Sequence, residues 1–149
     1  MVLHFLLYSV YFEETMVNPE PKKVPPRWYL EDHERPWTMN KERTWHWSQR
    51  AKVTKETRER FFWLAKMENI PKLDRVKIDA VPLINDRSKP IADIGACYPA
   101  VKAGIDGLVD AGVIPDDNSK HITEISFYAP VDSKHNGLRL VITDMGSEN

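Results

Sequence analysis

The sequence predicts a single α+β domain, an α/β sandwich with a small mixed sheet of about four strands and two main helices. Three observations lead to this fold class. The chain has 149 residues, 42% of them hydrophobic, which suits one compact domain with a buried core. Apolar residues alternate in several short stretches, and they recur with helical spacing in two longer segments. The resulting order of elements indicates helices packed on a sheet.

The N-terminal region is expected to lie outside this domain. Residues 1–15 begin with an apolar run that is too short to span a bilayer and lacks the basic start of a signal peptide, so we expect no membrane association. Four prolines in 17–26 are typical of a linker. We therefore divide the chain into a poorly ordered N-terminal extension and linker (1–26), a folded domain (27–143) and a C-terminal tail (144–149).

The first half of the domain is expected to contain two strands and one helix. A short strand is predicted at 27–31. A polar, aromatic and basic loop follows, and then a helix at about 54–68, which ends before Pro71. Alternating apolar residues predict a second strand at 75–84, and we expect Pro82 to interrupt it.

The second half begins with a loop and the clearest helix of the sequence. Pro99 suits a first helical turn, an apolar stripe follows at i, i+4, i+7 and i+8, and Gly112 provides the C-terminal stop. Gly104 and Gly107 lower helix propensity, so we expect them to permit close packing against the sheet or against a second subunit. Two further strands are expected, at 122–129 and 137–142.

Charge is unevenly distributed along the chain. The formal net charge is −1, which gives no global sign of nucleic-acid binding. However, seven Lys or Arg face three Glu in 41–60, a local balance of +4, whereas 101–149 has a local balance of −4. A chain polarised in this way could bind a polyanion with one part and a divalent cation with another. An ordinary mixed surface is an equally good interpretation of charge alone.

Cys97 is the only cysteine of the chain. One cysteine excludes an internal disulfide and any zinc site with several cysteines. The cytoplasm is therefore the simplest location.

Four charged residues stand near the two ends of the second helix. Asp93 precedes it, Lys102 lies near its start, and Asp116 and Asp117 follow it. Magnesium binds through one or two carboxylates and keeps several waters, and it can activate water and neutralise charge during phosphodiester hydrolysis. A neighbouring lysine can stabilise developing negative charge. Each residue alone also has a structural interpretation, because Pro-Asp-Asp-Asn is common turn chemistry.

The stretch from Asp93 to Asp117, DIGACYPAVKAGIDGLVDAGVIPDD, resembles RusA-like Holliday-junction resolvases, which are crossover-junction endodeoxyribonucleases, and most of all their divergent phage branch. The shared features are an Asp, a Pro six residues on, a Lys three further on, a D-G-L-V-D-A-G run from Asp106 to Gly112, and an Asp-Asp pair. PWTMN at 36–40 is similar to an early Pro/Asn segment of the family. The likeness covers about 27–143.

This resemblance implies a magnesium-dependent homodimer that makes paired nicks in four-way DNA junctions during recombination and repair, in the host cytoplasm if the chain is phage-encoded. Asp93, Lys102 and Asp117 would be catalytic. Asp93, Asp116 and Asp117 would bind Mg²⁺, for which Mn²⁺ could substitute. A homodimer matches the two equivalent scissile strands of a junction.

Two positions depart from the family's pattern. Ala96 stands where the phage branch has an Asn, and Ala96 and Tyr98 occupy the places of two Asp in the better-known branch. The missing Asn could weaken the positioning of metal or phosphate. It therefore motivates the alternative of a branched-DNA-binding protein that keeps the fold but cuts poorly.

A basic and aromatic segment provides the candidate DNA contacts. Basic side chains neutralise phosphates, and exposed tryptophans can stack on bases opened at a branch point. A core or interface position for the two tryptophans is the competing interpretation. The candidates are Arg43, Trp45, His46, Trp47, Arg50, Lys52 and Lys55.

The sequence leaves three hypotheses open. The first is a junction nuclease, and the second is a junction-binding protein that cleaves poorly. The third is an unrelated small α+β binding protein in which the Asp pair only forms a turn. Catalysis requires acidic groups from both sides of the second helix to converge beside Lys102.

Overall fold

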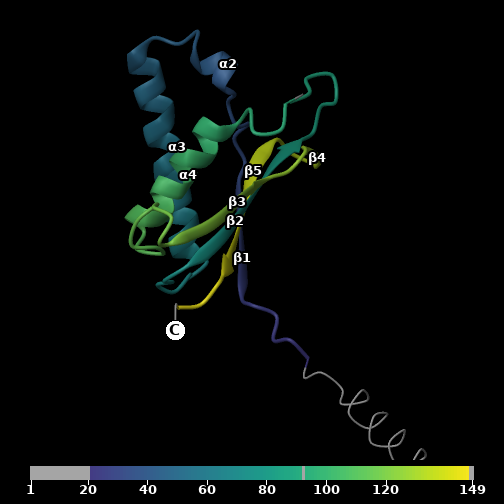
Figure 1. Ribbon diagram of the computed structural model, residues 1–149. Coiled ribbons are helices and arrows are strands. Elements are labelled where there is room, and N and C mark those ends of the chain that lie inside the picture. Colours follow the sequence, from purple (N-terminus) through teal and green to yellow (C-terminus); the bar gives the residue numbers. More distant parts are fainter. Residues whose placement is uncertain (1–20, 92, 148–149) are drawn as a thin grey trace, which may run out of the picture.

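The computed structural model describes residues 21–91 and 93–147 as three helices and five strands, which confirms the α+β class (Figure 1). The extension predicted at 1–15 and most of the linker lie outside the described residues. Residues 21–26 form neither helix nor strand, in line with the linker. The elements are β1 (Arg27–Asp32), α2 (Met39–Glu42), α3 (Trp47–Met67), β2 (Val76–Ile84), α4 (Tyr98–Asp110), β3 (Ile122–Phe127), β4 (Val131–Asp132) and β5 (Gly137–Asp144).

The five strands form one mixed sheet in the order β1-β5-β2-β3, with β4 pairing with the end of β2. β5 pairs antiparallel with β1 and β2, whereas β2 and β3 are parallel. Parallel pairing requires a long crossover, and α4 provides it. β4 was not predicted because its two residues lie in the polar loop between the last two strands.

The prediction that Pro82 interrupts the second strand is wrong, because β2 continues through it to Ile84. Pro82 pairs with Leu138 of β5 on one side. On the other side, pairing with β3 ends at Ala80 and pairing with β4 begins at Leu83. On the side of β3 and β4, Pro82 therefore lies between the ends of two ladders, so its missing N–H interrupts neither of them.

Within the described residues, both long helices lie on one side of the sheet (Figure 1). Side chains of alternate strand residues, including Ile78, Leu140 and Ile142, meet Phe61 of α3 and Ile105 of α4 in the main core. None of the described helices combines the length and apolar character that a bilayer span needs. The side that the helices do not cover is called the open face.

α3 begins seven residues before the predicted start at 54. The side chain of His46 caps the helix by accepting a hydrogen bond from the Ser48 N–H. The first turns of α3 are mostly exposed and polar, so they lack the apolar periodicity on which the prediction depended. At the other end, Asn69 adopts a left-handed conformation (φ 50°) shortly before Pro71.

α4 agrees closely with its prediction, and its glycines contact the helix and sheet of the same chain. A Cβ on Gly107 would lie 2.4 Å from the carbonyl oxygen of Arg58 in α3. A Cβ on Gly104 would lie 2.9 Å from Leu140 of β5. The small residues therefore allow α4 to pack tightly between α3 and the sheet.

Candidate functional site

Three charged side chains meet on and beside α4. Lys102 and Asp106 are four residues apart, so they lie on the same face of the helix. The loop after α4 folds back, and the Lys102 Nζ donates to Asp106 Oδ1 and to Asp117 Oδ2, each at 2.5 Å. Of the acidic groups that were expected to meet beside Lys102, Asp117 therefore does so. We call Lys102, Asp106 and Asp117 the α4 cluster.

The α4 cluster is partly exposed, and the contact between Lys102 and Asp117 favours the charged forms of both. Burial lowers the pKa of Lys102, but hydrogen bonds to Asp106 and Asp117 outweigh it, so the pKa lies above its usual value. The hydrogen bond from Lys102 holds the pKa of Asp117 below its usual value. Side-chain exposure of 39% for Lys102 and 34% for Asp117 leaves these groups accessible to a ligand.

Asp116 performs the turn chemistry that its sequence indicates. Its Oδ1 accepts from the N–H of Asp117 at 2.8 Å, and its Oδ2 accepts from the side-chain amide of Asn118 at 2.9 Å. Asn118 in turn accepts from the Lys120 N–H. Asp116 therefore fixes the turn that presents Asp117 to Lys102, and both of its oxygens already have partners.

Asp93 does not join the α4 cluster. Figure 1 shows the loop before α4 and the loop after it at opposite ends of the helix, which is about 20 Å long for its 13 residues. Within the described residues, the carboxylates of Asp93, Asp116 and Asp117 are not a set whose oxygens lie within 4.8 Å of one another. The requirement that acids from both sides of the helix converge is therefore not met within one chain.

The loop that carries Asp93 has a structural role. Ala96 accepts a hydrogen bond from the backbone N–H of Met39 in α2, and Cys97 is buried beside Ile84 and Ile91. Burial raises the pKa of the Cys97 thiol to about 11, so this side chain is a neutral part of the core rather than a nucleophile.

Asp110 of α4 lies between the α4 cluster and the basic part of α3. Asp110 lies four residues, or about 6 Å, beyond Asp106 on the same helix face. Arg58 of α3 donates to both oxygens of Asp110, a bidentate pair that links the two helices. Arg58 was not among the predicted DNA contacts, because only the tertiary structure brings it to Asp110.

A hollow of about 570 Å³ lies beside Arg58 and the first half of α3. We call it the α3 groove. Arg50 and Lys55 contribute positive charge to it, and Trp47, with 73% of its surface exposed, forms one wall. The full lining is Trp47, Arg50, Ala51, Thr54, Lys55, Arg58, Glu59 and Asp110.

The predicted DNA contacts divide between this groove and other roles. Arg50 and Lys55 line the groove, although Arg50 lies 3.6 Å from Glu42 and Lys55 lies 3.9 Å from Glu59. Lys52 is exposed beside Glu56, and Arg43 is near Asn40. His46 is the N-cap of α3, and its ring lies beside that of Trp47.

Trp45 agrees with the competing interpretation, a position in the core. Trp45 is half-buried and packs against the core, with its ring 6.0 Å from that of Trp37. Trp37 is buried and donates to Glu42, so this pair anchors α2 to the domain. Of the two candidate tryptophans, only Trp47 is free to stack on a base.

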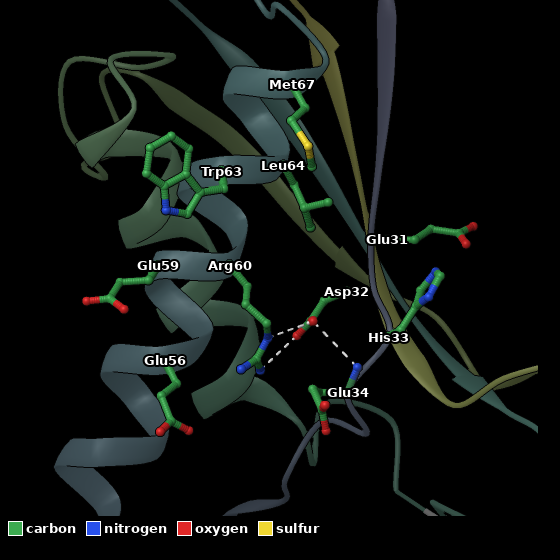
Figure 2. A pocket seen from close by; sticks show the side chains of 10 residues that line it. All are labelled: Glu31, Asp32, His33, Glu34, Glu56, Glu59, Arg60, Trp63, Leu64 and Met67. Carbon is green, nitrogen blue, oxygen red and sulfur yellow. Dashed lines mark hydrogen bonds and ion pairs between the residues drawn. The ribbon is translucent and has the colours of Figure 1, made fainter.

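The opposite side of α3 faces an acidic hollow of about 620 Å³ (Figure 2). Arg60 donates to Asp32 at 2.7 and 3.0 Å, and this pair joins α3 to the end of β1. Glu34, Glu56 and Glu59 also line the hollow, which makes it a poor surface for a polyanion. The two sides of α3 therefore differ in charge, and a polyanion would favour the α3 groove.

No family model matches the chain, and no curated protein matches it significantly. The resemblance of the central stretch to RusA-like resolvases therefore stays a prediction.

Proposed function

We propose that this chain is a magnesium-dependent endodeoxyribonuclease that cuts DNA strands at four-way junctions as a homodimer in the cytoplasm. The observation that carries this proposal is the meeting of Lys102 with two carboxylates on the side of α4 that leads to the α3 groove. A basic groove would hold the phosphate backbone, while the adjacent α4 cluster would carry the chemistry.

The α4 cluster has the donors that Mg²⁺ requires. The ammonium group of Lys102 lies between two carboxylates, and this is the electrostatic position that a metal cation would favour. Asp106 and Asp117 would hold the ion, since Mg²⁺ needs only one or two protein carboxylates. When bound, Mg²⁺ supplies charge neutralisation and an activated water.

The chain's own residues would position the scissile strand. Lys102 can move from its carboxylates towards a phosphate oxygen and neutralise charge there. Arg50 and Lys55 would bind flanking phosphates, and Trp47 would stack on an unpaired base at the branch point. Half-exposed side chains can make these movements at little cost.

The deciding experiment is cleavage of a synthetic four-way junction with Mg²⁺, with Mn²⁺ and with a chelator. Cleavage should require the metal, and Asp117→Asn should reduce it by roughly a hundredfold or more while sparing junction binding, since the change removes a metal ligand at nearly constant volume. Asp86→Asn is the matched control, because Asn can still accept the hydrogen bond from the Ser88 N–H that Asp86 accepts. Equal cleavage by Asp117→Asn and the control would contradict the assignment.

Asp93→Asn tests whether Asp93 is a metal ligand, as the family resemblance implies, or is not needed, as its position in the structure suggests. The structure leaves Asp93 outside the α4 cluster, so this variant should cleave within about threefold of wild type if Asp106 and Asp117 suffice. A loss as large as that of Asp117→Asn would mean that Asp93 enters the site only when DNA or a second subunit is bound.

A junction-binding protein that cuts poorly is the second candidate, favoured by the position of Asp93 and by Ala96. It is supported if the chain shifts a four-way junction at low salt but leaves it intact with both metals. If it does not bind the junction even at low salt, both candidates fail and an unrelated binding protein remains. Light scattering of the purified chain would test the homodimer separately.

A further inference from the structure

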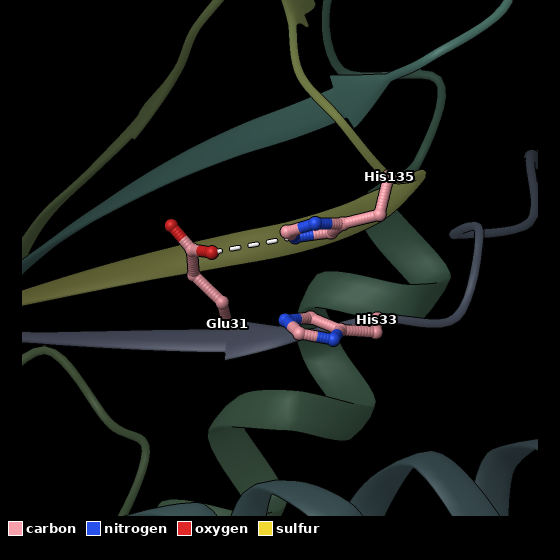
Figure 3. Close-up of side chains that lie close together, drawn as sticks. All are labelled: Glu31, His33 and His135. Carbon is pink, nitrogen blue, oxygen red and sulfur yellow. Dashed lines mark ion pairs between the residues drawn. The ribbon is translucent and has the colours of Figure 1, made fainter.

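A second cluster of possible ligands lies on the open face, away from the α4 cluster. Glu31, His33 and His135 each place one ligand atom so that all three atoms lie within 4.8 Å of one another. Figure 3 shows the two imidazole rings next to each other, tilted by 38°, beside the carboxylate of Glu31. Nε2 of His135 is 3.5 Å from Oε2 of Glu31, and the ring centroids of the histidines are 3.9 Å apart. We call these three residues the Glu–His cluster.

The register of the sheet explains how the cluster forms. Alternate residues of a strand share a face, so Glu31 and the residue two further on, His33, lie on the same side of β1. Glu31 pairs with Arg139 across the β1–β5 ladder. Figure 2 shows Asp32 directed towards Arg60 of α3, whereas Glu31 and His33 point away from α3.

Gly137 leaves room for the two histidines to meet. A Cβ at this position would lie 2.3 Å from the carbonyl oxygen of Asp32 and 3.5 Å from the Cα of His33. The backbone of β5 therefore approaches the end of β1 where a side chain would otherwise separate them. The backbone N–H of Asn85 donates to the side chain of Asn136, which anchors the loop that carries His135.

One nitrogen of the cluster lacks a hydrogen-bond partner. Nε2 of His135 is shielded from solvent and, within the described residues, makes no hydrogen bond. Shielded polar atoms are normally satisfied, and an unsatisfied imidazole nitrogen beside a carboxylate is a typical metal ligand.

Arg139 holds the carboxylate in position. Its Nε and Nη2 both contact Oε1 of Glu31, at 2.7 and 2.6 Å, which leaves Oε2 directed towards His135. The carboxylate is therefore oriented without any metal.

We propose that Glu31, His33 and His135 form a binding site for a divalent transition-metal ion of the zinc and cobalt class. Two imidazole nitrogens and one carboxylate oxygen are ligands of Zn²⁺, with a fourth position left for water. Mg²⁺ is disfavoured because it prefers oxygen ligands, and two of the three donors are imidazole nitrogens. The site would join the end of β1 to the loop before β5.

The test is calorimetric titration of the tag-free full chain with Zn²⁺, together with the visible absorption of bound Co²⁺. We expect one ion per chain at this site, with a dissociation constant in the micromolar range or below, and no displacement by excess Mg²⁺. His33→Ala should weaken Zn²⁺ binding by about tenfold or more, and so should His135→Asn. His33 is exposed, so its substitution should leave the fold intact, which circular dichroism would verify.

Two controls make the result specific. His46→Asn removes an imidazole elsewhere and keeps an N-cap residue for α3, so it should bind Zn²⁺ as wild type does. Asp86→Asn lies outside both clusters and keeps the hydrogen bond from the Ser88 N–H, so it should also bind Zn²⁺ as wild type does. Absence of Zn²⁺ binding at about 100 μM would overturn the proposal, and so would equal affinity of wild type and the His33 and His135 variants.

Discussion

The α4 cluster and the Glu–His cluster use charged residues in different ways. In the α4 cluster, Lys102 already lies between two carboxylates, and each contact is a charge-assisted hydrogen bond. In the Glu–His cluster, Arg139 satisfies one carboxylate oxygen and leaves an imidazole nitrogen without a hydrogen bond. A cation must displace Lys102 at the first cluster, whereas at the second it would lie between Nε2 of His135 and Oε2 of Glu31, which are 3.5 Å apart and make no hydrogen bond with each other.

This difference teaches that acidic residues alone do not define a metal site. Carboxylate oxygens that contact a lysine can bind a hard ion such as Mg²⁺, or they can only hold a loop against a helix. Nitrogen donors beside an oriented carboxylate select a softer ion. The following changes test whether the helix-covered side and the open face are independent in stability and in binding.

The largest effect is expected from Gly107→Ala, which acts on the helix-covered side. The added Cβ would lie 2.4 Å from a backbone oxygen and 3.0 Å from the backbone nitrogen of Phe62. Backbone atoms cannot move aside locally, so the free energy of unfolding should fall by about 3 kcal/mol, as measured by urea denaturation.

Gly104→Ala is the matched control for Gly107→Ala. It meets only the side chains of Leu140 and Phe61, which can adjust, and Ala favours the helix, so its cost should be about 1 kcal/mol. If the order of the two costs were reversed, the close approach of α3 and α4 at Gly107 would not be the tightest point. A folded Gly107→Ala variant should still bind Zn²⁺, since the Glu–His cluster lies on the other face.

Substitution of Trp45 should affect stability, whereas substitution of Trp47 should affect DNA binding. Trp45→Ala should lower the free energy of unfolding by about 2 kcal/mol, because Trp45 packs on Trp37 and the core. Trp47→Ala should change stability by less than about 0.5 kcal/mol, yet weaken junction binding by roughly tenfold. Denaturation curves and gel shifts of both variants check this, and equal junction binding by Trp47→Ala and wild type would remove the α3 groove from the DNA-binding surface.

The smallest effect concerns the pH dependence of the Lys102–Asp117 pair. The pKa of Asp117 is lowered in the folded state, so the pair stabilises the fold above pH 3.8 and loses that effect as the pH falls below it. The pKa of Lys102 is raised, so the effect also disappears as the pH rises past 10.5. Between these limits the contribution should be below about 1 kcal/mol, since both groups are partly exposed.

A double-mutant cycle with Lys102→Met and Asp117→Asn measures this coupling. The coupling energy should be present at about pH 7 and should decline as the pH falls below 3.8. A coupling energy that stays constant across this range would show that the two residues interact through packing and not through charge.

Helices and strands with a regular spacing of apolar residues were predictable, because that local spacing determines the type of element. The apolar stripe of α4, with Pro99 and Gly112 at its ends, predicted that helix to within one or two residues. The start of α3 was predicted seven residues too late, because its first turns are stabilised by the cap at His46 and not by an apolar face. The continuation of β2 through Pro82 depended on a change of neighbouring strand, which no local pattern reveals.

The candidate site was only partly predictable for a related reason. Lys102 and Asp117 were identified from sequence and do meet, and Asp106 was placed only in the D-G-L-V-D-A-G run. Asp93 and Trp45 were assigned to the site by residue type, but the packing of their segments places them elsewhere. The Glu–His cluster was missed because His135 is about a hundred residues from Glu31. The available signal was the spacing Glu31-x-His33 at the end of the strand predicted at 27–31.

The sequence by itself determined the order and class of the elements, the small residues of α4 and the chemical types of the candidate ligands. These depend on interactions within a few residues of the chain, which periodicity and capping report directly. Only the tertiary structure decided which charged groups meet. Contacts such as Lys102–Asp117 and Glu31–His135 depend on a loop that folds back and on strand register, and both are set by packing of the whole core.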